Sequence, residues 1–419
     1  MGGFAPHAPR IAPSDDRLFS LPVSSRKAQI STVLLSSFAQ GLVGSAFPAS
    51  AAVLRARGLT DPQYGSIFLP QMVLAAVGAT GAGLVLDRLG AKRGLALGFV
   101  LMALSQAALG AVVFAGESWT YPLALLGTSL LGLGAGVSAG PLNAYPQVLF
   151  TSRSESAVVA VHTVVGVGLA VTPVLAGAAL DRGLWLAVPV LLAAANLALL
   201  LVVERLDLPE PEPRHPGAPI ARPLGAPVLW LFVGIAALYG VAESVYANWA
   251  VVFLTEERGI GVAAAGLALT AFWAALTAGR LVVAAVVLRA RPATVLPVLA
   301  ALMAAAGLLV PLARSPRGAV LVFALGGLGC SAVFPLTLGL AGRRFPAHRA
   351  WVSSALFSAL VCGLGAGSLA TGLLHARLDL GTIFRLAALA PALAAFLAVR
   401  AAASGAARER ARLDPATAP

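Results

Sequence analysis

The segment from Gly83 to Arg93, Gly-Leu-Val-Leu-Asp-Arg-Leu-Gly-Ala-Lys-Arg, carries the pattern that decides the fold. It joins two long apolar runs, 63–86 and 95–115, and its four charged residues all fall in the short joint between them. A helix needs about 20 apolar residues to cross the hydrocarbon core of a bilayer. Two such runs joined by a tight basic turn predict two membrane-spanning helices with a short loop at one surface.

The rest of the chain repeats this pattern. Of its 419 residues, 59% are hydrophobic and 11% are charged, and the mean hydropathy is +0.88. Soluble proteins carry about 25% charged residues, so a soluble fold is excluded. Because backbone polar groups in lipid must be satisfied within each segment, we predict an all-α integral membrane protein with twelve transmembrane helices. The predicted spans are 28–54, 63–86, 95–115, 121–149, 157–180, 184–203, 228–254, 262–288, 293–313, 318–341, 351–374 and 382–403.

A Pro-rich, charged stretch divides the chain into two halves. It contains LPEPEPRHPGAPIARP, which is typical of a linker. The fourth span of each half carries a similar segment, GLGAGVSAGPL from Gly132 and GLGCSAVFPL from Gly327. We therefore predict two pseudo-symmetric six-helix bundles. The predicted parts are an N-terminal tail 1–27, a first bundle 28–203, a linker 204–227, a second bundle 228–403 and a C-terminal tail 404–419.

The basic residues predict the orientation. Most of the 29 Lys and Arg fall on one side of the predicted spans, together with the linker and both tails. Eight lie on the other side: Arg55, Arg57, Arg182, Arg258, Arg314, Arg317, Arg377 and Arg385. By the positive-inside rule we expect both termini to be cytoplasmic. We expect the protein to lie in the inner (plasma) membrane. The formal net charge of +12 follows from this arrangement, so we expect no nucleic-acid partner.

The joint after the second span resembles a family signature. Its residues Gly83, Asp87, Arg88, Gly90, Lys92 and Arg93 match G-x-x-x-D-R-x-G-x-K/R-K/R, the signature that the major facilitator superfamily carries in this loop. The resemblance implies a transporter built from two six-helix bundles. Gly90 allows a tight turn, and Asp87 at the membrane edge can pair with a neighbouring helix terminus or an Arg. Such a pair can hold one conformation and break in another, so we expect a conformational gate here.

Glu243 stands out among the 17 acidic residues because it lies deep inside a span, whereas the others fall in loops, linker or tails. It is about 22 Å along the helix from the inner end of its run. An ionisable group in the membrane is costly, which makes Glu243 a candidate for proton or substrate binding. A structural hydrogen-bonding role is the alternative. Arg280 is the other charge within a span, and we expect it to extend toward the inner surface. Two cysteines, Cys330 and Cys362, are expected to be buried.

Other polar and aromatic side chains near mid-span are candidates for a substrate cavity. They are Gln40, Asn143, Tyr145, His162, Tyr239, Tyr246, Asn248, Trp249 and Trp273. Tyr239, Glu243 and Tyr246 share one helix face at i, i+4 and i+7. Hydrogen-bonding groups beside aromatic rings suit a sugar or a similar polar solute, although each residue could instead serve only in packing.

Several segments are similar to the fucose-permease-like sugar porters within the superfamily. These segments are His162 to Pro173, Tyr239 to Trp249, Phe272 to Arg280 and Gly327 to Leu336. The resemblance implies sugar transport. Proton-coupled porters of that branch carry acids in the first and fourth helices, where this chain has Gln40 and Asn143. If protons are coupled here, Glu243 is the carboxylate left to carry them.

These patterns predict a secondary transporter, a symporter if proton-coupled, that moves a small solute by alternating access. Efflux of amphipathic compounds or organic acids is an alternative, and a non-transporting sensor or assembly factor with the same fold is another. Metalloprotease and phosphate-loop motifs do not occur in the sequence, and no enzyme activity, cofactor or metal is predicted. The expected partners are a small-molecule substrate, the lipid bilayer and protons, with the protein acting as a monomer.

Overall fold

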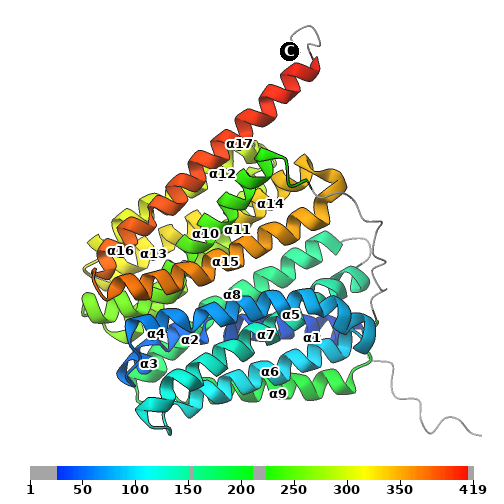
Figure 1. Cartoon of the computed structure of the whole chain (residues 1–419). Helices are drawn as coiled ribbons and strands as arrows, with labels where there is room; N and C mark the ends of the chain where they lie inside the picture. Colours follow the sequence, from blue (N-terminus) through cyan, green and yellow to red (C-terminus); the bar gives the residue numbers. More distant parts are fainter. Residues whose placement is uncertain (1–25, 151–153, 211–222, 414–419) are drawn as a thin grey trace, which may run out of the picture.

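The computed structural model describes residues 26–150, 154–210 and 223–413, which form a bundle of helices joined by short turns (Figure 1). The first half contains α1 (Arg26–Gly44), α2 (Ala46–Ala49), α3 (Ala51–Ala56), α4 (Asp61–Ser66), α5 (Phe68–Leu89), α6 (Ala91–Ala111), α7 (Glu117–Leu149), α8 (Ser154–Asp181) and α9 (Ala187–Arg205). The second half contains α10 (Pro227–Val252), η2 (Phe253–Glu257), α11 (Val262–Val286), α12 (Pro292–Leu309), η3 (Val310–Leu312), α13 (Pro316–Cys330), α14 (Val333–Arg344), η4 (Pro346–His348), α15 (Arg349–His375), α16 (Leu380–Ala387) and α17 (Leu389–Leu413).

Helices occupy each of the twelve predicted spans. Ten helical stretches of the described residues are long and apolar enough to cross a membrane. The first two predicted spans hold α1 to α3, which are separated at Ser45 and Ser50, and α4 with α5. The tenth span is divided into α13 and α14, with Ser331 and Ala332 between them. The predicted all-α membrane fold is confirmed, and the twelve runs agree with it.

The two halves repeat one packing scheme. In the first half α1 packs on α8, α5 on α7 and α6 on α9, and in the second half α10 packs on α15, α11 on α13 and α12 on α17. A Cβ at Gly132 of α7 would overlap the Gln71 carbonyl of α5, and a Cβ at Gly327 of α13 would overlap the Phe272 carbonyl of α11. These two glycines begin the similar segments of the halves. A shared need for close helix approach therefore explains the similarity.

The halves meet where α8 packs on α11 and where α15 packs on α4 and α5. Close backbone contacts hold the end away from the linker: Gly372 of α15 lies against the Asp61 carbonyl, and Gly266 of α11 lies against the Pro173 carbonyl of α8. This end is on the left in Figure 1, and toward the linker end α15 and α17 incline away from α1, α6 and α9. The halves are thus held together at the end away from the linker, which we call the outer end.

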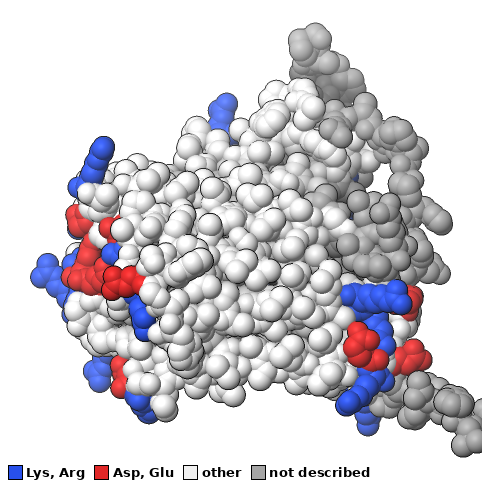
Figure 2. Space-filling model, turned by 60° about the horizontal axis from the view of Figure 1, so that its bottom comes forward, with Lys and Arg blue, Asp and Glu red and all other residues white. Residues whose placement is uncertain are grey.

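On the face shown in Figure 2, most charged side chains gather at the two ends of the molecule, with a largely uncharged belt between them. Such a belt is expected where lipid chains surround the helices. Cys330 is buried, as expected, but the expectation for Cys362 was wrong, because this residue is exposed on α15. In a membrane helix, an outward position contacts lipid and accepts a small apolar side chain as readily as the interior does.

Candidate functional site

A group of polar side chains lies near the middle of the spans, and we call it the central polar group. It consists of Asn143 on α7, His162 on α8, Tyr239 and Glu243 on α10, and Arg280 on α11. His162 Nε2 lies 3.0 Å from Asn143 Oδ1. The Asn143 amide also donates from Nδ2 to the Ala139 carbonyl one turn earlier, at 2.7 Å. Because its nitrogen is used in this way, the amide oxygen is the acceptor and His162 donates from Nε2.

Glu243 lies in the interior of α10, as predicted, and is partly exposed. The Tyr239 hydroxyl, one turn earlier on the same helix, donates a hydrogen bond to the Glu243 carboxyl. Arg280 on α11 and Cys330 on α13 also interact electrostatically with this carboxyl. Glu243 therefore faces the interior of the second half, where α10, α11 and α13 converge.

Arg280 does not extend toward the linker end, so that expectation was wrong. Its Nε donates to the Ser331 carbonyl at 3.1 Å, in the break between α13 and α14. Two features of the sequence explain this. Helical side chains lean toward the helix N-terminus, and α11 begins at the outer end, so Arg280 leans toward mid-span. Pro335, four residues after Ser331, has no N–H to donate to the Ser331 carbonyl, which leaves that oxygen able to accept from Arg280.

His162 and Arg280 stand on the two helices, α8 and α11, through which the two halves meet. They interact electrostatically across the α8–α11 interface. One turn from His162, Gly166 lies against the Thr277 side chain of α11, so this interface has close contact beside the two polar residues. His162 is exposed and Arg280 is partly exposed, although both lie in membrane-spanning helices. The central polar group is thus assembled from both halves and is accessible.

Two predicted cavity residues lie instead in the packed cores. Tyr145 is fully buried among apolar side chains of the first half, and its hydroxyl has no hydrogen-bond partner among the described residues. Tyr246 is buried in the second half, where its hydroxyl donates to the Met303 carbonyl at 3.0 Å. Its ring stacks on Phe272 with 5.6 Å between centroids. Neither tyrosine contributes to the central polar group.

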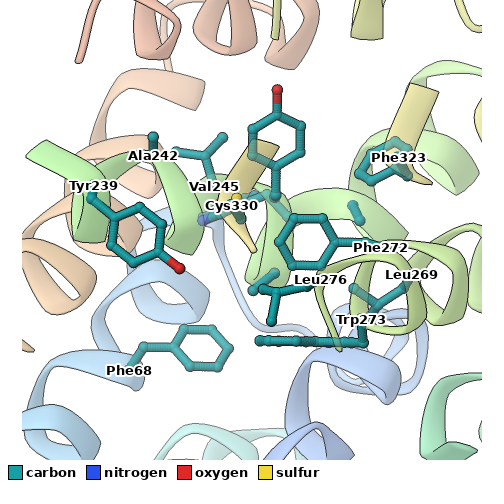
Figure 3. Close-up of a cluster of buried hydrophobic side chains, with 14 of the residues drawn as sticks. Phe68, Tyr239, Ala242, Val245, Leu269, Phe272, Trp273, Leu276, Phe323 and Cys330 are labelled. Atoms are coloured by element: carbon teal, nitrogen blue, oxygen red, sulfur yellow. The ribbon is translucent and has the colours of Figure 1, made fainter. Parts of the chain in front are cut away.

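Gln40 and Trp273 lie near the interface between the halves. Gln40 on α1 donates to the Ala135 carbonyl of α7 at 3.4 Å, within the first half. Trp273 on α11 is almost buried, and its indole Nε1 has no hydrogen-bond partner among the described residues. In Figure 3 the Tyr239 hydroxyl points toward Trp273 and toward Phe68 of the first half. Trp273 therefore keeps an unused donor beside the central polar group.

A family model of the Major Facilitator Superfamily matches residues 30–316. The chain belongs to this superfamily. The match covers the first half from residue 30 onward and the second half as far as the start of α13, so it includes every residue of the central polar group. As a member of the superfamily, the chain is a transporter of small solutes, and the central polar group lies where its two bundles meet.

Solved structures share the superfamily fold. A mutant form of the nucleoside transporter NupG matches with a TM-score of 0.73 and 14% identity, over 90% of this chain and 100% of that one. A bacterial homolog of the human lysosomal transporter Spinster, in an inward-facing and occupied conformation, matches with a TM-score of 0.68 and 16% identity, over 90% of this chain and 95% of that one. At these identities the likeness concerns the fold. No curated protein matches the sequence.

The outer end of this superfamily member holds a charged cluster that the sequence did not suggest. Arg55 of α3 pairs with Asp61 of α4 at 2.7 Å and with Glu256 of η2 at 3.0 Å, so it joins the two halves. His375 of α15 lies 3.9 Å from Asp61 and 4.0 Å from Glu257. Sequence reasoning placed these acids in separate loops. In the sequence, the one signal for this cluster was that charges of opposite sign stand near the ends of several predicted spans.

Asn248 and Trp249, predicted for the cavity, belong to this outer contact. The Tyr64 hydroxyl of α4 donates to the Asn248 carbonyl at 2.7 Å. The ring of Tyr64 meets Trp249 edge-on, with 5.0 Å between centroids. Because α10 is continuous through Gly240, these two residues lie about three turns closer to the outer end than Tyr239. They seal the contact between the halves and lie away from the central polar group.

The signature segment lies at the linker end. Gly83, Asp87 and Arg88 fall within α5, but the side chains of residues 82–89 lie outside the described part. Gly90 has φ +84°, in the left-handed region that favours glycine, and ends the turn before α6 as expected. The Ala91 N–H donates to Glu210 Oε2 at 2.8 Å. The Lys92 ammonium donates to the Glu204 carbonyl at 2.9 Å, so the linker is fastened to the first half. Arg93 is exposed.

Proposed function

We propose that the protein is a proton-coupled secondary transporter of a small polar solute, such as a sugar or similar metabolite. The central polar group is the solute site and Glu243 is the proton site. The composition of this group supports the proposal most directly. His162 and Asn143 come from one half, and Tyr239, Glu243 and Arg280 come from the other. A rotation of one half against the other would separate these partners and release a bound solute.

The contacts at the outer end support alternating access. Arg55 and Glu256 join the halves there, and Tyr64 bonds to the backbone of the opposite half. A cycle in which these contacts break, while others form at the linker end, would expose the solute site to each side in turn. The asymmetry of basic residues supports cytoplasmic termini and a location in the inner (plasma) membrane.

The proposal is tested with the full-length protein in liposomes. First, a solute that binds is identified as the sugar, nucleoside or organic acid that raises the melting temperature of the protein in detergent. An inward proton gradient should then drive its accumulation by the wild type. Glu243→Gln should abolish this accumulation but retain counterflow exchange, because the amide cannot carry a proton. Glu117→Gln, at an exposed carboxyl at the outer start of α7, is the control. Unchanged accumulation in Glu243→Gln, or binding without any flux in the wild type, would refute the proposal.

Efflux of an amphipathic compound is a second candidate, because the first half contains an apolar cavity near the linker end. The cavity has a volume of about 240 Å³ and is formed by Ile30, Val33, Leu34, Pro146, Leu149, Phe150, Ala157, Ala160 and Val161. An apolar tail could enter this space while a polar head reached Asn143. Substitution of Val161 by Asn would then raise the KM for an amphipathic compound and leave that for a sugar unchanged. Equal effects on both would count against efflux.

A further inference from the structure

We propose that the solute is a small organic anion, whose carboxylate binds Arg280 when Glu243 has taken up a proton. This inference rests on the proposed function and specifies its substrate class. It begins from a guanidinium inside the membrane that is only partly used. Arg280 donates from Nε to Ser331 O, whereas its two terminal nitrogens donate to no described residue. An Arg in a membrane span is costly unless it is paired or functional, and these free donors are available to a ligand.

The protein offers Arg280 no close counter-ion. The ion pairs within 4.0 Å among the described residues all lie at the outer end and none includes Arg280. Glu243 interacts with Arg280 electrostatically, but the two do not form an ion pair at that distance. Two adjacent N–H groups of a guanidinium bind both oxygens of a carboxylate, which a neutral hydroxyl cannot match. The unused side of Arg280 therefore favours a carboxylate ligand.

Neighbouring polar groups complete a site for a polar acid. His162, on the opposite half, donates from Nε2 to Asn143, so its Nδ1 is an acceptor, and the charge of Arg280 acts on its ring across the interface. Trp273 keeps an unpaired indole N–H in an almost buried position. The indole N–H can donate to a hydroxyl or carbonyl oxygen elsewhere on the solute, and His162 Nδ1 can accept from a hydroxyl. A hydroxy acid or sugar acid meets all of these requirements at once.

Charge balance couples the anion to the proton. The groups facing Glu243 are Tyr239 on its own helix, Arg280 on α11 and Cys330 on α13, with His162 beyond Arg280. Toward α15, Gly240 of α10 meets the backbone of Leu360 and Gly363, and the titratable His375 of α15 lies beside Trp249, nearer the outer end. The empty site, with Glu243 ionised and Arg280 charged, is neutral. The loaded site, with Glu243 protonated and one bound monoanion, is also neutral, so neither form carries net charge through the membrane potential.

Matched pairs of acids and neutral compounds test this inference. Glucuronate with glucose and glycerate with glycerol are compared by thermal shift and by uptake into liposomes at pH 6 and pH 8. We expect the acids to bind at least about tenfold more tightly than their neutral partners, and more tightly at pH 6. Arg280→Gln should remove this preference and Arg280→Lys should retain part of it. Arg314→Gln, an exposed outer-loop change, should leave it intact. Uptake driven by the pH gradient should not respond to a valinomycin-imposed potential.

The results separate this inference from the proposed function. Proton-driven uptake of glucose or glycerol at least as strong as that of the acids would overturn the anion assignment and leave proton-coupled transport standing. Stabilisation of the wild type by no acid would also overturn it, as would an acid preference that Arg280→Gln retains in folded protein. Absence of proton-driven flux for every compound, with acids still bound through Arg280, would instead refute the proposed function.

Discussion

Arg55 and Glu256 join the two halves at the outer end through two hydrogen bonds, from Nε to Oε1 at 3.0 Å and from Nη2 to Oε2 at 3.2 Å. They stand 201 residues apart in the sequence. Arg55 also pairs with Asp61 of its own half, so one guanidinium binds an acid from each bundle. Because this bond must break for the outer end to open, it is expected to favour the conformation seen here.

Loss of this ion pair should shift the protein toward an outward-open form. A partly exposed pair contributes about 0.2–1 kcal/mol, which corresponds to a population change of up to about fivefold. In Arg55→Gln, a larger fraction of molecules should therefore show a long distance between two spin labels. The labels replace Glu117 and Arg314, and the distances are measured by double electron–electron resonance. Arg57→Gln is the matched control, because Arg57 donates to Val113 within its own half. Identical distance distributions for both variants would mean that the pair does not act as a gate.

Gly65 should be required for closure of the outer end. A Cβ at this position would lie 2.6 Å from the Ser368 carbonyl of α15, where only backbone could move away. Gly65→Ala should thus separate α4 from α15 and lower the melting temperature of the detergent-solubilised protein. Gly81→Ala serves as control, since a Cβ at Gly81 meets nothing within 4 Å. A melting temperature for Gly65→Ala equal to that of Gly81→Ala would contradict the contact.

Asp379 should give the outer end a pH-dependent stability. It caps α16, and the hydrogen bonds that it accepts from the Thr382 side chain and backbone lower the pKa of its carboxyl. The ionised Asp379 carboxyl contributes its full stabilisation of the folded state above its unfolded-state pKa, about 3.9. This contribution is lost as the pH falls through the lower folded-state pKa. Asp379→Ala should cost about 0.5–2 kcal/mol at neutral pH.

A pH series can isolate the charge at this cap. Asp379→Asn keeps a capping oxygen without the charge, so the wild type should melt above it at neutral pH. The two melting curves should converge as the pH is lowered through the folded-state pKa of Asp379. A difference that stays constant over the whole acid range would show that ionisation of Asp379 contributes nothing.

The linker should be released by loss of Glu210. Its carboxylate lies against Gly90 and accepts from the Ala91 N–H at the start of α6, where negative charge is favoured. Glu210→Ala should therefore speed proteolysis within the linker several-fold. Glu204→Gln provides the comparison, because Glu204 binds Lys92 through its carbonyl rather than its side chain. Equal cleavage rates in Glu210→Ala and the wild type would contradict this role.

The helices and the pairing of the halves could be predicted from sequence because lipid imposes a strict requirement. A backbone in hydrocarbon must bond within its own segment, so each apolar run is a helix. Glu243 could be found by the same reasoning, since a carboxylate within such a run is conspicuous. The side-chain direction of Arg280 could also have been derived, from the lean of helical side chains and from Pro335, although its length suggested an extension toward the surface instead.

Contacts between distant helices could not be predicted. Tyr145 and Tyr246 look like Tyr239 in the sequence, because each is an aromatic residue near mid-span. Their burial in the packed cores depends on helix rotation, which apolar residues on every face do not specify. The pairing of Arg55 with Glu256 depends on the conformation of the whole molecule, since it exists only while the outer end is closed.

Proton counting tests the central claim most directly. Liposomes that contain the protein and an internal pH-sensitive dye would report the protons entering with each molecule of the solute selected by thermal stabilisation. The wild type should take up one proton with each solute molecule, and Glu243→Gln should exchange solute without moving protons. If Glu243→Gln carries as many protons per solute as the wild type, Glu243 is not the proton site and the proposed mechanism is wrong.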